Sequence, residues 1–277
     1  MKKLIVITGP TASGKTARAV ALAGQYGCDV ISADSRQVYA GIPIVTAQPT
    51  EEERRGVRHH LIGHLPLDSY YSASGFEQDA LRLIDSQFAA SDVAIVCGGS
   101  MLYIDALCNG IDDLPTIPED FRNELKARFE EEGAESLLSH LKLLDPDYYA
   151  KADLKNLKRA FHAVEISLYS GKPYSSLLTG RKRPLPFEVE KTVIELPRDI
   201  LFERINRRVD AMVAAGLEEE ARSVYHLKGL NSLNTVGLKE MFAWFEGSMR
   251  RGEAIERIKK NTRVFAKKQL TWLKRAN

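Results

Sequence analysis

The sequence contains little cysteine, and its three cysteines follow no metal-binding or disulfide-forming pattern. Cys28, Cys97 and Cys108 show no C-x-x-C spacing, and their number is odd. Structural zinc sites usually draw on closely spaced cysteine pairs, and small secreted domains pair their cysteines in disulfides. The pattern therefore indicates a reducing compartment and argues against a zinc site.

Long apolar runs are missing as well. No apolar stretch approaches the roughly 18 residues that a membrane-spanning helix needs. The apolar run at residues 4–7, which follows Lys2 and Lys3, is too short for the core of a signal peptide. The sequence also has no internal repeat and no low-complexity tract. We therefore expect a cytoplasmic, soluble protein with no membrane partner.

The chain carries little net charge, but its charges are unevenly distributed. The formal net charge is only +2, whereas the segment from Arg257 onward has eight Lys and Arg residues and no Asp or Glu. We predict an amphipathic helix over residues 253–275 whose apolar face is buried. Its basic face could be a solvated surface or a surface for an acidic partner. The apolar face comprises Ile255, Ile258, Phe265, Ala266, Trp272 and Leu273, and the basic face comprises Lys259, Lys260, Arg263, Lys267 and Lys274.

Apolar strand-like segments alternate with helices at both ends of the chain. Helix-forming segments at residues 16–26 and 199–212 follow the first and the last of these strands. The alternation predicts an α/β fold with a parallel sheet of the doubly wound kind. A chain of 277 residues can bury such a core together with a smaller unit. The expected strands, which are short and rich in β-branched residues, are residues 4–8, 29–32, 92–97 and 189–196.

The middle of the chain departs from this alternation. Residues 116–186 hold three helix-like segments, the last of them over residues 148–169, and no convincing strand. Prolines, which usually end regular structure, mark both edges of the stretch. We therefore predict a P-loop core in two parts, residues 1–115 and 187–277, interrupted by a helical insertion domain at 116–186.

A phosphate-binding loop separates the first strand from the first helix. Residues 9–16 match the pattern G-x-x-x-x-G-K-[ST], whose glycines let backbone N–H groups turn toward phosphate oxygens. Lys15 adds a positive charge, and the helix adds the positive end of its dipole. The Thr16 hydroxyl is placed to bind Mg²⁺, the cofactor that we expect. The predicted diphosphate-binding residues are Gly9, Pro10, Thr11, Ala12, Ser13, Gly14, Lys15 and Thr16.

The loop does not identify which diphosphate is bound, but the positions of nearby carboxylates narrow the choice. A kinase or NTPase commonly carries an acidic residue after a later strand to help hold Mg²⁺. Here the strand at 92–97 ends instead in Gly98 and Gly99. Asp34 follows the strand at 29–32, at the edge of the sheet where α/β enzymes bind their substrates. Taken alone, Asp34 could equally be a helix cap or a base.

Together these motifs resemble those of the tRNA dimethylallyltransferases, also called tRNA isopentenyltransferases. The resemblance covers nearly the whole chain, and it rests on the series in order, because each motif alone is weak. After the phosphate-binding loop the series includes Asp34-Ser35-x-Gln37-Val38-Tyr39, His59-His60-Leu61, Gly98-Gly99-Ser100, Leu144-Asp145-Pro146, Gly171-Lys172-Pro173, Arg207-Arg208-Val209-Asp210 with Met212, Thr235-Val236-Gly237 with Lys239-Glu240, and Thr262-Arg263 with Ala266-Lys267-Lys268-Gln269.

The resemblance implies a reaction and the residues that perform it. The dimethylallyl group of dimethylallyl diphosphate is transferred to N6 of the adenosine 3′ to the anticodon of a tRNA, and diphosphate is released. Asp34 matches the general base, while Thr11, Lys15, Thr16 and Arg208 match residues that hold the diphosphate with Mg²⁺. We expect a monomer that binds the anticodon loop. The residues expected to contact tRNA are Asp34, Ser35, Arg36, Gln37, Ser100, Arg122, Lys158, Arg159, Asn234, Lys239, Arg263, Lys267 and Lys268.

Four positions depart from the family pattern. Met101 replaces a usual Gly, Gln48 a usual Lys, His162 a common Arg and Leu238 a usual Tyr. None of the four is expected to bind the diphosphate or to act as the base. The resemblance therefore implies intact chemistry and leaves the substrate preference and the tRNA affinity open.

Two other functions explain part of the sequence. A small-molecule kinase of the adenylate-kinase type would account for the phosphate-binding loop, for Arg208 and for a helical lid, but not for the basic C-terminal segment. A non-catalytic RNA-binding relative would account for the four departures, but not for the intact loop and Asp34.

Two groups of side chains have both a functional and a structural interpretation. His59 and His60 could suggest a metal pair, but no third ligand is evident, and we expect them to form structural hydrogen bonds. Tyr70, Tyr71 and Phe76 could line an apolar pocket for the prenyl group or pack in the core.

Overall fold

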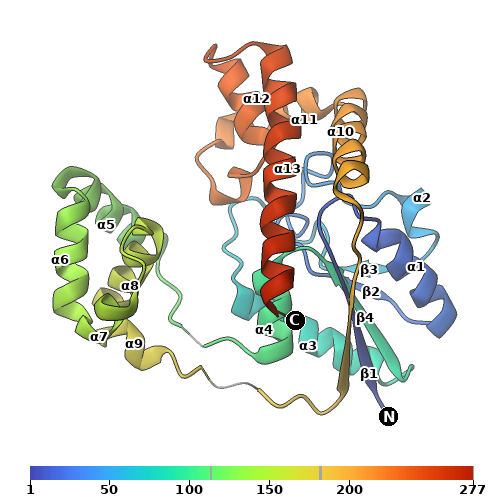
Figure 1. The fold of residues 1–277 in the computed structure, drawn as a ribbon, viewed down its shortest axis with the longest axis horizontal. Helices are drawn as coiled ribbons and strands as arrows, with labels where there is room; N and C mark the ends of the chain where they lie inside the picture. The colour runs from blue at the N-terminus through green and yellow to red at the C-terminus, as the bar shows by residue number, and fades with distance from the viewer. Residues whose placement is uncertain (113, 181–182, 277) are drawn as a thin grey trace. The chain divides into compact units, whose positions relative to one another are not determined.

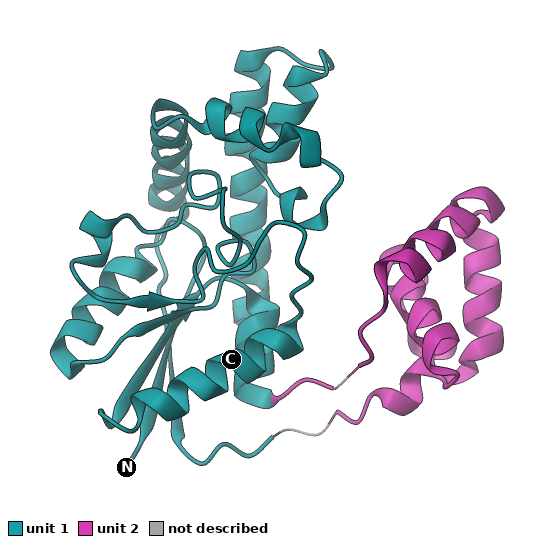
Figure 2. Ribbon diagram, turned by 180° about the vertical axis from the view of Figure 1, so that it is seen from behind, with its two compact units in different colours: residues 1–109, 183–277 teal, residues 110–182 magenta. Residues whose placement is uncertain are grey.

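The structure, a computed structural model, describes residues 1–112, 114–180 and 183–276. The chain forms two compact units, which Figure 2 distinguishes by colour. None of the helices in the described part of the chain combines the length and the apolar character that crossing a membrane requires. Unit 1 comprises residues 1–109 and 183–277, and unit 2 comprises residues 110–182.

The limits of unit 2 differ slightly from those expected from the prolines. We expected an insertion at residues 116–186, whereas the compact unit spans 110–182. The returning chain already belongs to unit 1 at Arg183, whose N–H donates a hydrogen bond to Asn109 O. The Arg183 guanidinium also pairs with the buried carboxylate of Glu77 at 2.9 Å. These contacts fix the boundary before the prolines are reached.

Unit 1 is built on a five-stranded parallel sheet in the order β3-β2-β4-β1-β5 (Figure 1). Ile5 and Ile7 of β1 pack against the first helix, while Leu4 and Val6, on the opposite face of the sheet, are also buried. Burial on both faces explains why this strand reads as a continuous apolar run. The α/β class and the parallel sheet are confirmed. The strands are β1 (Lys3–Thr8), β2 (Val30–Ser32), β3 (His59–His60), β4 (Val93–Gly98) and β5 (Glu188–Val193).

The edge strand β3 was not predicted, because two histidines carry no apolar pattern. His60 Nε2 lies 2.8 Å from Asp29 Oδ2, and His59 Nδ1 lies 3.0 Å from Val57 O. The histidines therefore form structural hydrogen bonds, as expected. Within the described residues, no group of three His, Cys, Asp or Glu side chains is arranged to hold a metal ion.

The register of the strands places three loops side by side. Thr8 of β1 is paired with Gly98 of β4, and Ser32 of β2 is paired with Cys97. The chain therefore leaves all three strands at the same edge of the sheet. The phosphate-binding loop, the turn that contains Asp34 and the turn that contains Ser100 meet there.

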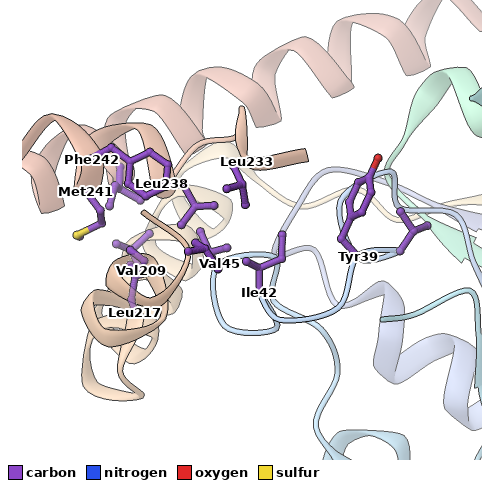
Figure 3. Packing of buried hydrophobic residues seen from close by; sticks show 13 residues of the cluster. Tyr39, Ile42, Val45, Val209, Leu217, Leu233, Leu238, Met241 and Phe242 are labelled. Atoms are coloured by element: carbon purple, nitrogen blue, oxygen red, sulfur yellow. The ribbon is translucent and has the colours of Figure 1, made fainter. Parts of the chain in front are cut away.

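Helices surround the sheet and extend beyond it (Figure 1). A second apolar cluster, shown in Figure 3, joins Val45 of a loop to Val209 and Leu217 of two helices. The helices of unit 1 are α1 (Lys15–Tyr26), α2 (Glu51–Arg54), α3 (Ala73–Gln87), α4 (Met101–Asn109), α10 (Arg198–Ala214), α11 (Leu217–Ser223), α12 (Leu238–Phe245) and α13 (Arg251–Ala276), with short 3₁₀ helices η1 (Tyr225–Leu227) and η2 (Asn231–Leu233).

Helices α10 and α13 run antiparallel, and their contacts correct the expected division of α13 into two faces. Lys259 pairs with Asp210 at 2.8 Å, the Arg263 guanidinium binds the Asn206 side chain, and the Lys267 ammonium lies over the Phe202 ring. Part of the basic face therefore packs on α10. Conversely, Phe265 was assigned to the core but is 43% exposed.

Unit 2 is a helical bundle with its own core. Leu141 and Val164 are fully buried in it, between the second and the fourth helix. The helix expected over residues 148–169 is two helices, because Ala152 is extended and Asn156 caps a new helix start with its side chain. The helices are α5 (Glu119–Glu132), α6 (Ala134–Leu144), α7 (Pro146–Lys151), α8 (Leu157–Ser170) and α9 (Tyr174–Leu177).

Candidate active site

The phosphate-binding loop is held open by backbone conformations that favour glycine. Gly9 has φ +153° and Gly14 has φ +96°, and a Cβ atom on Gly9 would lie 2.6 Å from Ile194 O. Ser13 Oγ is buried and has no hydrogen-bond partner among the described residues. A buried hydroxyl without a partner is costly. A phosphate oxygen in the loop would supply the missing partner.

Lys15, at the start of α1, forms no ion pair with the residues that the structure describes. Its Nζ donates a hydrogen bond to Pro10 O at 2.7 Å. Burial lowers the pKa of Lys15 to about 8, and although Cys97 and Asp34 act in the opposite direction, Arg208 lowers it further. A bound anion would offset this destabilisation of the charged form.

A second cation reaches the loop from α10. Arg208 Nη1 donates to Thr11 Oγ1 at 3.2 Å. Burial lowers the pKa of Arg208, partly offset by Glu53 and Asp34, yet a guanidinium stays charged at neutral pH. The loop thus has two partly buried cations, Lys15 and Arg208, where a diphosphate would lie.

Asp34 caps a turn with one oxygen and faces a pocket with its side chain. Oδ1 accepts hydrogen bonds from Arg36 N at 2.9 Å and from Gln37 N at 3.3 Å. None of the described residues donates a hydrogen bond to Oδ2. The two interpretations of Asp34, cap and base, are therefore compatible, because each would use a different oxygen.

Ser100 is fixed beside the Asp34 turn. Ser35 N donates to Ser100 Oγ at 2.7 Å, and Ser100 N donates to Ala33 O at 3.1 Å. The two turns approach so closely that a Cβ atom on Gly98 would lie 2.1 Å from Ala33 O. Position 98 therefore requires glycine, and the turn after β4 forms a wall of the same pocket as Asp34.

These loops enclose a pocket of about 340 Å³ within unit 1. Helix α13 contributes one continuous face to it, formed by Ile258, Thr262, Phe265 and Gln269, at spacings of four, three and four residues. The polar lining includes Thr11, Asp34, Ser100, Arg208 and Gln269, and the apolar lining includes Val45, Met212, Leu217, Val236, Ile258 and Phe265.

Two of the lining residues were not assigned to a site from the sequence. Phe265 was expected in the core, and Gln269 occurred only within the family-like motif Ala266-Lys267-Lys268-Gln269. Gln269 is 2% exposed. The stripe that Phe265 and Gln269 share with Thr262 is visible in the helical spacing, but only the fold shows that it faces a phosphate-binding loop.

The residues expected to contact tRNA fall into three groups. Ser35, Ser100, Asn234 and Lys239 line the pocket together with Asp34 and Arg36. A second group is exposed at the protein surface: Lys158 and Arg159 on α8 of unit 2, and Lys267 and Lys268 on α13 of unit 1. In the third group the polar side chain is bonded within the protein: Gln37 to Thr46 O and Ala47 O, Arg122 to Glu165, and Arg263 to Asn206. Arg36, which lines the pocket, is also bonded to Asn231 O and Ser232 O.

Three of the four departures from the family pattern, Gln48, Leu238 and Met101, lie in unit 1. Gln48 Nε2 donates to Gln37 O and Tyr39 O, and so closes the loop of which Val45 is part. Leu238 is buried in the apolar cluster of Figure 3. Met101 is the first residue of α4.

The fourth departure, His162, lies in unit 2. Its Nδ1 is 3.0 Å from the buried carboxylate of Glu165, which also binds Arg122 at 2.8 Å. His162 thus shares a carboxylate with a residue expected to contact tRNA.

Packing accounts for two of the three side chains suggested for a prenyl pocket, Phe76 and Tyr71. Phe76 is fully buried and stacks on Tyr103 with the ring centroids 4.4 Å apart. The Tyr71 hydroxyl donates to Asp79 at 2.8 Å, and its ring meets Tyr103 edge-on. Tyr70 is 56% exposed. None of the three lines the pocket described above.

Comparisons with known proteins identify the family to which the chain belongs. A family model described as IPP transferase matches residues 37–276. The chain is 47% identical over 275 residues both to tRNA dimethylallyltransferase 1 of Bacteroides thetaiotaomicron and to tRNA dimethylallyltransferase 2 of Parabacteroides distasonis, covering 99% of this chain and 89% and 92% of those proteins.

Solved structures give the same result. A tRNA isopentenylpyrophosphate transferase of Bacillus halodurans matches with a TM-score of 0.70 and 36% identity, over 99% of this chain and 87% of that one. A eukaryotic dimethylallyltransferase acting on tRNA matches with a TM-score of 0.83 and 28% identity, over 99% and 70%. The chain therefore belongs to the IPP transferase family, that of the tRNA dimethylallyltransferases.

Proposed function

We propose that this enzyme transfers the dimethylallyl group of dimethylallyl diphosphate to N6 of the adenosine 3′ to the anticodon of tRNA, and releases diphosphate. One observation carries the proposal: a single pocket is lined both by Thr11 of the phosphate-binding loop and by Asp34. The names of the relatives support tRNA and the dimethylallyl group as substrates.

The diphosphate end of the pocket is suited to a leaving group. Lys15 and Arg208 place two partly buried cations at the loop. Negative charge grows on the diphosphate as the bond from its oxygen to the allylic carbon breaks. Fixed positive charges that act where charge develops lower the barrier. Thr11 fixes the Arg208 guanidinium on the loop.

Mg²⁺ fits this site only together with the diphosphate. The Thr16 hydroxyl, in the first turn of α1, is the protein ligand that we propose, since the described residues offer no carboxylate cluster for a metal. Mg²⁺ typically binds through few protein groups and the oxygens of a substrate phosphate. When bound, it would supply further positive charge to the leaving group.

On the acceptor side of the pocket, we propose that Asp34 accepts the proton that leaves the adenine N6. As the adenine N6 forms a bond to the allylic carbon, the carbon–oxygen bond breaks, the bonding electrons leave with the diphosphate, and a proton passes from N6 to Asp34. Oδ2 is available for this because the turn is capped by Oδ1. The target adenine must leave the base stack of the anticodon loop to reach the pocket.

The apolar lining of the pocket suits the five-carbon group. Met212 and Phe265, from α10 and α13, provide apolar surface beside the polar groups. An apolar wall also excludes water, which would otherwise compete with N6 for the allylic carbon.

A transfer assay tests the proposal. Incubation of the protein with labelled dimethylallyl diphosphate, unmodified tRNA and Mg²⁺ should place label in the tRNA, and a parallel assay should detect no consumption of ATP. Phosphate transfer from ATP to a small acceptor, with unlabelled tRNA, would instead support a kinase. Binding of tRNA without any transfer would support a non-catalytic relative.

We further propose that exposed lysines of α13 bind the tRNA backbone. Lys267→Gln combined with Lys268→Gln should weaken tRNA binding and flatten its salt dependence, by about 0.9 in the slope of log K against log salt for each phosphate that the protein no longer neutralises. Fluorescence titrations of tRNA at several salt concentrations measure this slope.

The control for the Lys267→Gln, Lys268→Gln double variant is the substitution of a lysine at the opposite edge of the sheet. Lys3 is paired with Glu188 and Glu190 at the start of β1, so Lys3→Gln should leave the slope unchanged. We no longer expect Arg263 to contribute, because Asn206 holds its guanidinium. An unchanged slope in the double variant would show that these lysines only face solvent.

A further inference from the structure

One buried side chain connects the C-terminal helix to both polar walls of the pocket. Gln269, on α13, is 2% exposed. Its Oε1 accepts a hydrogen bond from Thr11 N at 2.9 Å, and its Nε2 donates one to Gly99 O at 2.9 Å. A single amide therefore joins the phosphate-binding loop to the turn after β4.

The Thr11 end of this bridge acts on the diphosphate site. With its N–H bonded to Gln269, the Thr11 backbone is held, and its Oγ1 accepts the hydrogen bond from Arg208. If Thr11 moved, the Arg208 guanidinium would lose its partner on the loop. Gln269 thus fixes the position of a cation that it does not touch.

The hydrogen bond to Gly99, at the other end of the Gln269 bridge, affects the positions of Lys15 and of the proposed base, Asp34. A Cβ atom on Gly99 would lie 2.6 Å from Gln269 Nε2 and 3.7 Å from Lys15 Nζ, so both side chains pack against this residue. The next residue, Ser100, accepts the hydrogen bond from Ser35 N in the turn that begins with Asp34. The bridge therefore spans from the diphosphate site to the proposed base.

We propose that Gln269 is a positioning residue, which sets the separation between the diphosphate-binding loop and the Asp34–Ser100 wall. The inference rests on the proposed function, because the two walls are assigned there to the donor and the acceptor. A glutamine is required because one atom must accept from a backbone N–H while the other donates to a backbone carbonyl. Because Gln269 is only 2% exposed, it offers tRNA almost no surface, and we expect its loss to weaken donor binding and lower the rate of transfer.

Gln269→Glu provides the test, because its protonation state controls one of the two hydrogen bonds. The ionised carboxylate can still accept from Thr11 N but can only repel Gly99 O. The protonated carboxyl group can donate again. Above neutral pH we expect kcat/KM for dimethylallyl diphosphate to fall about tenfold or more, as for a buried hydrogen bond left unmade. As the pH is lowered toward 5, the kcat/KM of the variant relative to wild type should begin to recover, because burial raises the pKa of such a carboxyl, an effect that the nearby Lys15 ammonium opposes in part.

A second variant and a separate substrate make the test specific. Gln269→Met keeps the size of the side chain and removes both hydrogen bonds, so its loss should be similar and independent of pH. In both variants the KM for tRNA should stay within about twofold of wild type, since a residue that bound tRNA would raise that constant instead.

A structural control lies one turn further along α13. Leu273 is 5% exposed, and Leu273→Ala should lower the melting temperature without changing the KM for the donor. The inference is overturned if the Gln269 variants lose kcat/KM only in proportion to a fall in melting temperature, as Leu273→Ala would. It is also overturned if the kcat/KM of Gln269→Glu relative to that of wild type does not change with pH. If the wild-type protein transfers no label, the proposed function fails instead, and the two failures are distinguishable.

Discussion

Asp34→Asn should lower the single-turnover rate of transfer by about 10² to 10⁴, the usual contribution of a positioned general base. The amide keeps the size of the side chain, and its oxygen can still accept the hydrogen bonds from Arg36 N and Gln37 N. What the substitution removes is the basicity toward the N6 proton. Rapid-quench measurement with labelled donor and saturating tRNA gives the rate.

Two controls separate the role of base from the other roles of Asp34. Asp34→Ala should lose rate to a similar extent but should also lower the melting temperature, because the turn loses its cap. If Asp34 instead holds Mg²⁺, Asp34→Asn should raise the Mg²⁺ requirement, and excess Mg²⁺ should restore most of the rate. Such a rescue, or a rate within about twofold of wild type, would remove Asp34 from the role of base.

Lys15→Ala should lose affinity for the donor together with rate. The ammonium meets the diphosphate before and during its departure, and the loss of one such fixed group typically costs about 10² to 10³ in kcat. Equilibrium binding of a non-reactive diphosphate and the transfer assay measure the two effects. Asp34→Asn should show the opposite pattern, with donor affinity held or slightly raised, because removal of a carboxylate near the loop removes repulsion.

The matched control for Lys15→Ala is Arg18→Ala. Arg18 is an exposed cation on the same helix, so its removal changes the charge of α1 without touching the loop. Donor binding should be nearly unchanged. Because burial disfavours the Lys15 ammonium, Lys15→Ala should not lower the melting temperature. An equal loss of donor affinity in Lys15→Ala and Arg18→Ala would indicate that the charge of α1 as a whole, and not Lys15 in particular, determines donor binding.

The pH dependence of donor binding follows from the same lysine. Burial lowers the pKa of Lys15 to about 8, while a bound diphosphate favours the charged form and raises that pKa. Affinity should therefore be highest below about pH 8 and should fall as the pH rises through that value. Proton uptake on binding, measured by calorimetry in two buffers near pH 8, checks the sign. Lys15→Ala should abolish the uptake.

The sequence predicts the residues at the carboxyl edge of the sheet because local pattern and chemistry coincide there. The phosphate-binding motif requires a strand before it and a helix after it, and Asp34 follows a strand directly. The parallel register then brings these loops together without further information.

The remainder of the site depends on contacts between distant parts of the chain. Gln269 reaches Thr11 only because α13 passes the sheet edge, and Phe265 reaches the pocket for the same reason. Amphipathic periodicity assigned Phe265 to the core because periodicity identifies an apolar stripe but not what faces it. Likewise Arg263 appeared to be a surface charge, since nothing local indicates its bond to Asn206 on α10.

The most direct test of the central proposal is the location of the transferred group. After incubation with dimethylallyl diphosphate, Mg²⁺ and wild-type protein, nuclease digestion and mass spectrometry of the tRNA should identify one modified nucleoside. We predict a dimethylallyl group on N6 of the adenosine 3′ to the anticodon, formed without ATP and absent from a parallel reaction with Lys15→Ala. A modified nucleoside elsewhere in the tRNA, or an unmodified tRNA with ATP consumed, would contradict it.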